Sequence, residues 1–138
     1  MTDDITLGWL RDLEELRSLP ARYAQAADDR DHDAVEACFH PDGTVTTADG
    51  DLAASAYVQR MRDNPSPFVS GTHLMGLPVI ELEPGSDSAT VSTPAVVHQI
   101  AGEGGNDLVL GMRYVDTVVR TEDGWLIEHR TPVRRWMR

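Results

Sequence analysis

The spacing of hydrophobic residues changes about halfway along the chain, and this change limits the possible folds more than any other feature. In the second half, four stretches have the apolar and β-branched composition of strands, at 71–82, 88–100, 108–120 and 125–136. Short turn sequences separate them. Strands joined by short turns pair with their neighbours as an antiparallel meander. The second half of the chain is therefore predicted to form one antiparallel sheet.

The first half instead carries hydrophobic residues at helical spacing. The longest such stretch runs from Ile5 to Ala27 and contains Pro20, which predicts either a kinked helix or two helices. Asp31 is suited to cap a second, short helix, and a third is expected at about 53–62. Helices followed by a long antiparallel sheet predict an α+β fold. A bent sheet wrapped around these helices would enclose a conical pocket.

Length and charge narrow the classes of protein. A chain of 138 residues fits one domain, so residues 1–138 are expected to form a single unit. The formal net charge of −11 argues against nucleic acid and anionic membrane surfaces as partners, because both need a basic face. The acidic start, Met1-Thr2-Asp3-Asp4, lacks the basic region of a signal peptide. We therefore expect a cytoplasmic protein.

Two histidines lie in stretches that otherwise resemble buried strands. They are His73 and His98, and an acidic pair, Asp28-Asp29, ends the first predicted helix. Polar groups in apolar surroundings need partners. An imidazole beside a carboxylate in such surroundings is also an acid–base catalyst. The sequence therefore predicts a catalytic site of His73, His98 and Asp28, with purely structural roles for these side chains as the alternative.

Other residues are candidates for binding a substrate. The two-residue period of a strand places Met75 on the same face as His73, and Tyr114 on the same face as Asp116. Asp116 is interpreted either as a buried acid or as the ion-pair partner of Arg113 or Arg130. His32, His40 and His129 are expected at the surface or in turns. The candidate substrate-binding residues are Tyr23, Tyr57, Met75, Tyr114 and Asp116.

The motifs of several other chemistries are missing from the sequence. There is no glycine-rich phosphate loop, no nucleophile elbow of the G-x-S-x-G type, and no H-E-x-x-H or paired-cysteine metal motif. His73, His98 and Asp28 are possible metal ligands, but their spacing is not a recognised ligand pattern. We therefore expect neither a cofactor nor a metal.

Over nearly its full length the chain resembles the SnoaL-like branch of the nuclear-transport-factor-2-like superfamily. The segment 23–33, followed by Cys38-Phe39-His40-Pro41-Asp42-Gly43, is similar to the opening helices of that family. Thr72-His73, Arg113-Tyr114-Val115-Asp116 and Asp123-Gly124-Trp125-Leu126-Ile127 are similar to its sheet. The resemblance implies a cone-shaped α+β barrel of cystatin-like topology, with N-terminal helices packed in a strongly bent antiparallel sheet.

Within this superfamily the chain is most similar to scytalone dehydratase and related cofactor-free dehydratases. Asp28 matches the helix aspartate of those enzymes, His73 their first histidine, and His98-Gln99 their second. Bacterial bile-acid dehydratases share the spacing of Tyr23 and Asp28. Two tyrosines that hold the departing water in scytalone dehydratase are replaced here by Ala27 and Thr47. Their substitutes are expected among Tyr23, Tyr57 and Tyr114.

The resemblance implies a cofactor-independent dehydratase that acts on a hydrophobic cyclic or polyketide-like molecule. His73 would be the main acid or base, His98 would assist it, and Asp28 would orient an imidazole. The alternatives are a polyketide cyclase or ketosteroid-type isomerase with Asp28 as proton shuttle, or a binding module that catalyses nothing. Because a bent sheet leaves apolar surface uncovered, a homodimer is expected, with a trimer as the alternative.

Overall fold

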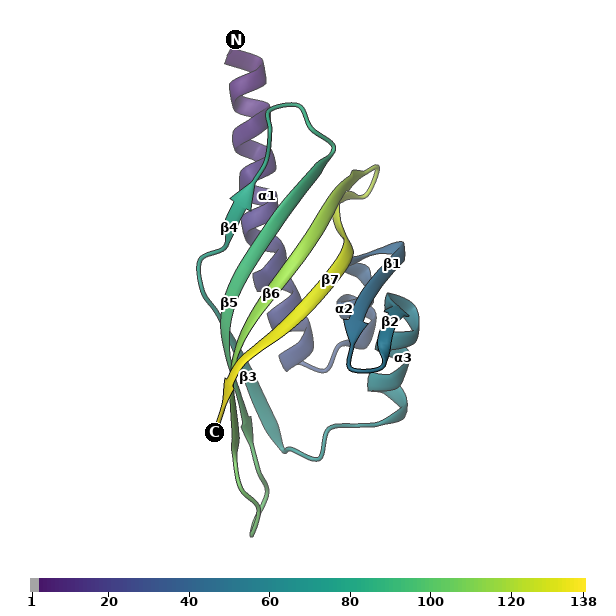
Figure 1. The fold of residues 1–138 in the computed structure, drawn as a ribbon, viewed down its shortest axis with the longest axis vertical. Coiled ribbons are helices and arrows are strands. Elements are labelled where there is room, and N and C mark those ends of the chain that lie inside the picture. Colours follow the sequence, from purple (N-terminus) through teal and green to yellow (C-terminus); the bar gives the residue numbers. More distant parts are fainter. Residues whose placement is uncertain (1–2) are drawn as a thin grey trace.

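The computed structural model describes residues 3–138, so Met1 and Thr2 of the acidic N-terminal stretch lie outside it (Figure 1). The helices are α1 (Asp3–Asp28), α2 (His32–Ala37) and α3 (Ala54–Asp63). The strands are β1 (Phe39–Thr47), β2 (Gly50–Ala53), β3 (Ser70–Met75), β4 (Val79–Glu81), β5 (Ser88–Ile100), β6 (Leu108–Thr121) and β7 (Gly124–Met137). This order of elements confirms the predicted α+β class.

The strands form one curved sheet in the order β2-β1-β7-β6-β5-β3, with β4 also paired to β5. Neighbouring strands are antiparallel except β1 and β7, which run parallel with Phe39 opposite Ile127. The sheet is therefore mixed, and it stays open instead of closing into a barrel. The parallel pair was not predicted because it joins a strand of the first half to the last strand. The stretch predicted as one strand at 71–82 is divided into β3 and β4 around Gly76-Leu77-Pro78.

Helix α1 lies across one face of the sheet. Helices α2 and α3 lie near the C-terminal end of α1, beside β1 and β2 (Figure 1). Pro20 lies inside α1, which is one continuous helix, so the alternative of two helices is wrong. The buried face of α1 includes Leu16, Leu19 and Tyr23. These side chains join a hydrophobic core with residues of the sheet such as Trp125 and Ile127. The core thereby fixes the end of α1 against the sheet.

Gly43 allows β1 to approach β7 closely. A Cβ atom at this position would lie 2.9 Å from the carbonyl oxygens of both His40 and Ile127. Backbone atoms cannot move aside easily, so Gly43→Ala is expected to lower the free energy of unfolding by about 1–3 kcal/mol. Urea unfolding measures the change. Gly8→Ala is the control, because a Cβ there meets nothing within 4 Å; equal effects of both substitutions would contradict the explanation.

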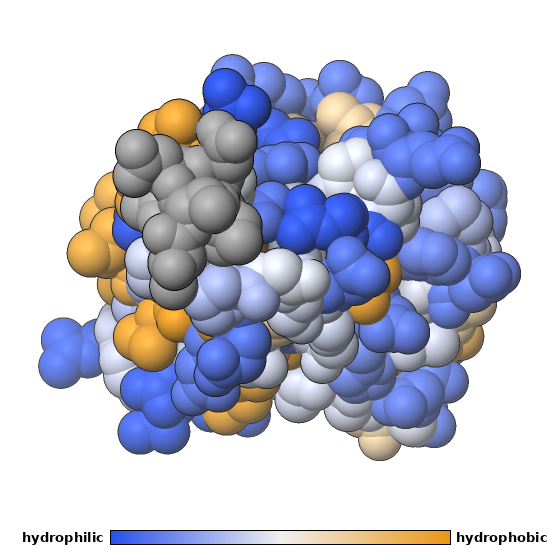
Figure 2. All heavy atoms as spheres, turned by 90° about the horizontal axis from the view of Figure 1, so that it is seen from above, coloured by the Kyte–Doolittle hydropathy of each residue, from blue (hydrophilic) through white to orange (hydrophobic). Residues whose placement is uncertain are grey.

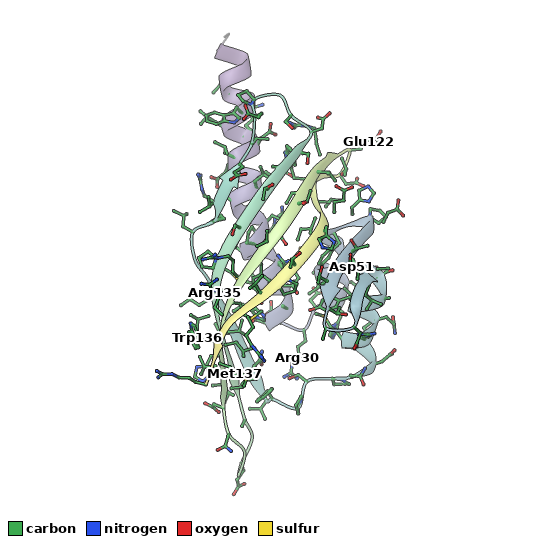
Figure 3. The ribbon with its side chains drawn as sticks, viewed as in Figure 1. Arg30, Asp51, Glu122, Arg135, Trp136 and Met137 are labelled. Atoms are coloured by element: carbon green, nitrogen blue, oxygen red, sulfur yellow. The ribbon has the colours of Figure 1, made fainter. Side chains whose placement is uncertain are left out.

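The face of the sheet opposite α1 exposes several hydrophobic side chains. Leu74, Val96, Ile100 and Trp136 are between 36% and 68% exposed. The Trp136 ring covers Gly111, where a Cβ would lie only 2.1 Å from it. Figure 3 shows Trp136 near the end of β7, between Arg135 and Met137. Figure 2, which views the molecule along its long axis, shows most of the hydrophobic (orange) surface at the left, with smaller orange areas at the centre and right. We call Leu74, Val96, Gly111 and Trp136 the outer patch.

None of the helices within residues 3–138 combines the length and apolar character needed to cross a bilayer.

Candidate active site

A cavity of about 260 Å³ lies between the C-terminal end of α1, helices α2 and α3, and the strands β3, β5 and β6. Its tyrosines, Tyr23, Tyr57 and Tyr114, are buried or half-buried, whereas Arg30, Asn64 and Ser66 are exposed. The remaining lining residues are Ala27, Asp28, His32, Val35, Met61, Pro65, Gly71, His73 and Gln99. The cavity thus has an aromatic interior and a polar mouth.

Asp28 and His73 meet at the wall of this cavity. The Nδ1 atom of His73 lies 2.7 Å from Oδ1 of Asp28, and the backbone N–H of His73 donates to both carboxylate oxygens at 3.0 Å. The His73 side chain is only 16% exposed and the Asp28 side chain only 22%. An ionised carboxylate only accepts hydrogen bonds, so the neutral tautomer of His73 that fits this contact carries its proton on Nδ1 and a lone pair on Nε2. This imidazole is therefore arranged to accept a proton at Nε2.

His98 does not join them. On β5 the odd-numbered residues from Ala89 to Val97 face inward, so His98 points to the opposite face of the sheet. There its Nε2 lies 3.1 Å from Asp107 Oδ2, and both side chains are 46% exposed. The expected convergence of two imidazoles and one carboxylate is therefore wrong for His98. Gln99 takes the inward position and lines the cavity instead.

The three tyrosines of the cavity come from α1, α3 and β6. Tyr23 packs edge-on against His73, with 6.5 Å between the ring centroids, and lies 6.3 Å from the ring of Tyr114. Burial raises the pKa of Tyr114 to about 12. The nearby Tyr23, and then burial, raise the pKa of Tyr57 well above its ordinary value. Both phenols therefore keep their protons at neutral pH and remain hydrogen-bond donors.

Asp116 is buried beside the cavity and forms an ion pair with Arg130. Two parallel hydrogen bonds of 2.8 Å join the carboxylate to the guanidinium, and the side chains are only 2% and 1% exposed. Burial alone would lower the pKa of Arg130, but the Asp116 carboxylate outweighs it and raises the pKa above its usual range. The guanidinium also lies 4.1 Å from the ring centre of Tyr23 and 4.6 Å from that of Tyr114. The pair thus supports the aromatic wall from behind.

The remaining predicted residues have different outcomes. Met75 borders a separate depression beside Asp28 and His73 and is not in the lining of the main cavity. His32, expected at the surface or in a turn, lines the cavity, as does Arg30. Sequence reasoning gave no role to Arg30 or Gln99, although both lie in segments that carry the family resemblance, because it treated Gln99 only as the neighbour of His98. Among residues 3–138, no group of three His, Cys, Asp or Glu side chains is arranged to hold a metal ion.

N-terminal helices packed against a curved mixed sheet, with a cavity between them, make this an α+β fold. The chain belongs to the family described as the SnoaL-like domain, whose sequence model matches residues 9–131. No curated protein matches the sequence.

Solved structures share the fold at low sequence identity. A structure described as a putative scytalone dehydratase from Novosphingobium aromaticivorans has a TM-score of 0.81 at 21% identity, covering 99% of this chain and 91% of that one. An NTF2-like protein with a cystatin-like fold from the same organism has a TM-score of 0.80 at 24% identity, and the match covers 94% of this chain and 86% of that one. The hexachlorocyclohexane dehydrochlorinase LinA-type3 from Novosphingobium barchaimii has a TM-score of 0.78 at 13% identity, and the match covers 99% of this chain and 93% of that one.

Proposed function

We propose that this protein is a cofactor-independent lyase, a dehydratase that acts by proton transfer on a hydrophobic cyclic or polyketide-like molecule. The observation that carries the proposal is the contact of 2.7 Å between His73 Nδ1 and Asp28 Oδ1 at the wall of a cavity lined by three tyrosines. A histidine held in one tautomer by a carboxylate is a general base. Buried phenols donate hydrogen bonds to a developing enolate oxygen.

The proposed reaction uses only these side chains. His73 Nε2 takes the proton from the carbon next to a substrate carbonyl, and a tyrosine hydroxyl stabilises the enolate oxygen. The electron pair of the broken C–H bond forms a carbon–carbon double bond, and the C–O bond of the neighbouring hydroxyl breaks. The departing hydroxide takes the proton back from the His73 imidazolium and leaves as water. Asp28 stabilises that imidazolium throughout.

Elimination is favoured over isomerisation by the names of two similar structures. One is described as a putative scytalone dehydratase and another as a hexachlorocyclohexane dehydrochlorinase, and both names denote eliminations. The alternative function, a polyketide cyclase or ketosteroid-type isomerase, would use the same cavity with Asp28 as proton shuttle. The third alternative is a binding module in which both histidines are structural. The position of His98 on the opposite face of the sheet from His73 is the observation that favours it.

Product analysis separates these functions. The protein is incubated with scytalone, hexachlorocyclohexane, a ketosteroid and a panel of cyclic β-hydroxy ketones, and the products are measured by mass spectrometry. A dehydratase gives a product lighter by one water, whereas an isomerase gives no change in mass. Binding without turnover of any compound would contradict the proposed enzyme and favour the binding module.

Asp28→Asn is expected to lower turnover by about 10–100-fold. The reason is that a hydrogen bond to a charged group contributes about 1.5–3 kcal/mol, and about 1.4 kcal/mol corresponds to a tenfold change. Steady-state kinetics on a substrate found by the panel measures the change. Asp29→Asn removes the same charge from the adjacent, exposed residue and is expected to leave turnover unchanged. Equal losses in both variants would show that Asp28 acts only through general charge.

We also propose that the partner is a second copy of the chain, bound through the outer patch. The patch supports this because its exposed side chains Leu74, Val96 and Trp136 are apolar. Val96→Glu is expected to convert a dimer into a monomer, because it would bury an unpaired charge. Light scattering after gel filtration measures the mass. A wild-type monomer would contradict the dimer, and a threefold mass would favour the trimer.

A further inference from the structure

Arg30 has an unusual backbone conformation at the end of α1. Its φ angle is 54°, and it is the only non-glycine residue with a positive φ among residues 3–138. Such a conformation is uncommon for a residue with a Cβ, and here it closes α1: the Arg30 N–H donates to the carbonyl oxygen of Ala27 and the Asp31 N–H to that of Ala26. The guanidinium donates a hydrogen bond from Nη2 to the carbonyl oxygen of Phe68. Figure 3 shows Arg30 between the end of α1 and the segment that leads into β3.

This arrangement places a positive charge at the cavity mouth. Arg30 is the only arginine in the cavity lining. The chain has 23 acidic residues, yet among the side chains described in residues 7–138 no carboxylate lies within ion-pair distance of Arg30. Arg130, by contrast, is neutralised by Asp116. Only one of the five donors of Arg30 is used, so the others remain available.

Other polar groups lie at the same cavity. The Nδ1 atom of His32 is buried and has no hydrogen-bond partner within the described part of the chain. His32 and Gln99 both line the cavity. A buried polar atom without a partner is costly, and a bound ligand can supply the missing hydrogen bond. The Asp28 carboxylate, the one acidic group in the lining, is already engaged by the backbone and ring of His73.

We infer that Arg30 determines specificity by binding a carboxylate on the substrate. The substrate would then be a hydrophobic ring compound with a carboxylate, its ring among the three tyrosines and its charge at the guanidinium. A planar guanidinium matches a carboxylate with two parallel hydrogen bonds. This inference concerns the cavity of the proposed function and rests on that function for the identity of the ligand as a substrate.

Pairs of unreactive ligands test the inference by calorimetry. Benzoate, 2-naphthoate and 2-anthracenecarboxylate are each compared with the corresponding neutral amide, which has nearly the same shape. The wild-type protein is expected to bind the best carboxylate at least about tenfold more tightly than its amide, because a hydrogen bond to a charged group exceeds a neutral one. Arg30→Gln is expected to abolish this preference, and Arg30→Lys to retain part of it.

Arg60→Gln is the matched control, because it removes the same charge from α3 outside the cavity lining and is expected to keep the preference. Three results would overturn the inference. One is equal binding of carboxylate and amide by the wild-type protein, and another is no measurable binding of any carboxylate. The third is an Arg30→Gln variant that binds both ligands more weakly but keeps the preference, which would show that Arg30 only holds the segment at Phe68.

A second assay separates this inference from the proposed function. The probe is 5-nitrobenzisoxazole, a neutral bicyclic compound. Its five-membered ring opens when a base removes the proton from the carbon of that ring. If the wild-type protein opens this ring and His73→Gln does not, the base is present whatever the calorimetry shows. A charge preference without ring opening would support the role of Arg30 and count against the proposed base.

Discussion

Replacing His73 with glutamine is expected to lower turnover at least about a hundredfold, because a positioned general base contributes about 10²–10⁴-fold. Glutamine retains polarity and approximate size, so the cavity keeps its shape. Its amide has no basic nitrogen. In the described structure His73 is the only histidine whose imidazole contacts Asp28. Steady-state kinetics on a substrate of the panel measures the loss.

His98→Gln is the matched control for this prediction. The substitution is the same, and the two histidines lie on neighbouring strands, where Thr72 pairs with His98 and His73 with Val97. The two histidines lie on opposite faces of the sheet, and they therefore differ in exposure and in the carboxylate that each contacts. Turnover is expected to stay at the wild-type level in His98→Gln. Equal losses in the two variants would contradict the assignment of His73.

Asp116→Asn is expected to lower the free energy of unfolding by about 3–5 kcal/mol, because it leaves the buried Arg130 charge without a partner. Asparagine has nearly the same shape as aspartate, so the loss reports charge and hydrogen bonding more than packing. The side chains are only 2% and 1% exposed, which means that water cannot replace the lost carboxylate. Urea unfolding followed by circular dichroism measures the effect.

Two further variants check this explanation. Asp87→Asn breaks an ion pair with Arg120 in which the aspartate is 83% exposed, and surface pairs of this kind contribute only about 0–1 kcal/mol. Replacing both buried partners, as Asp116→Leu with Arg130→Met, is expected to recover most of the lost stability, since a buried ion pair can be exchanged for apolar side chains. An Asp116→Asn protein as stable as the wild type would contradict the account.

The two histidines show what the sequence could and could not predict. Alternation along a strand says which residues share a face, and the odd positions of β5 include Ala89, Val91, Ala95 and Val97. That bias toward apolar residues would have assigned His98 to the outward face. Sequence reasoning instead treated both histidines as catalytic because each lies in an apolar, strand-like stretch, and the resemblance to enzymes with two catalytic histidines agreed with this. The sequence predicted the two histidines with equal weight, and the structure separates them because only His73 contacts Asp28 at the cavity.

The polar partners of the cavity were harder to predict because they depend on contacts distant in sequence. Asp116 and Arg130 face each other across β6 and β7, and the sequence offered Arg113 equally well until the register was known. Arg30 depends on an unusual backbone angle and on a carbonyl oxygen of Phe68, neither of which leaves a mark in residue spacing. The parallel pairing of β1 with β7 had no local signal for the same reason.

The most direct test of the proposed base is the rate at which the protein opens 5-nitrobenzisoxazole. The account predicts a saturable rate that falls when deuterium replaces the hydrogen on the ring carbon. It also predicts loss of this rate in His73→Gln and its retention in His98→Gln. A rate that survives in His73→Gln would contradict the assignment of His73 as the group that removes the proton.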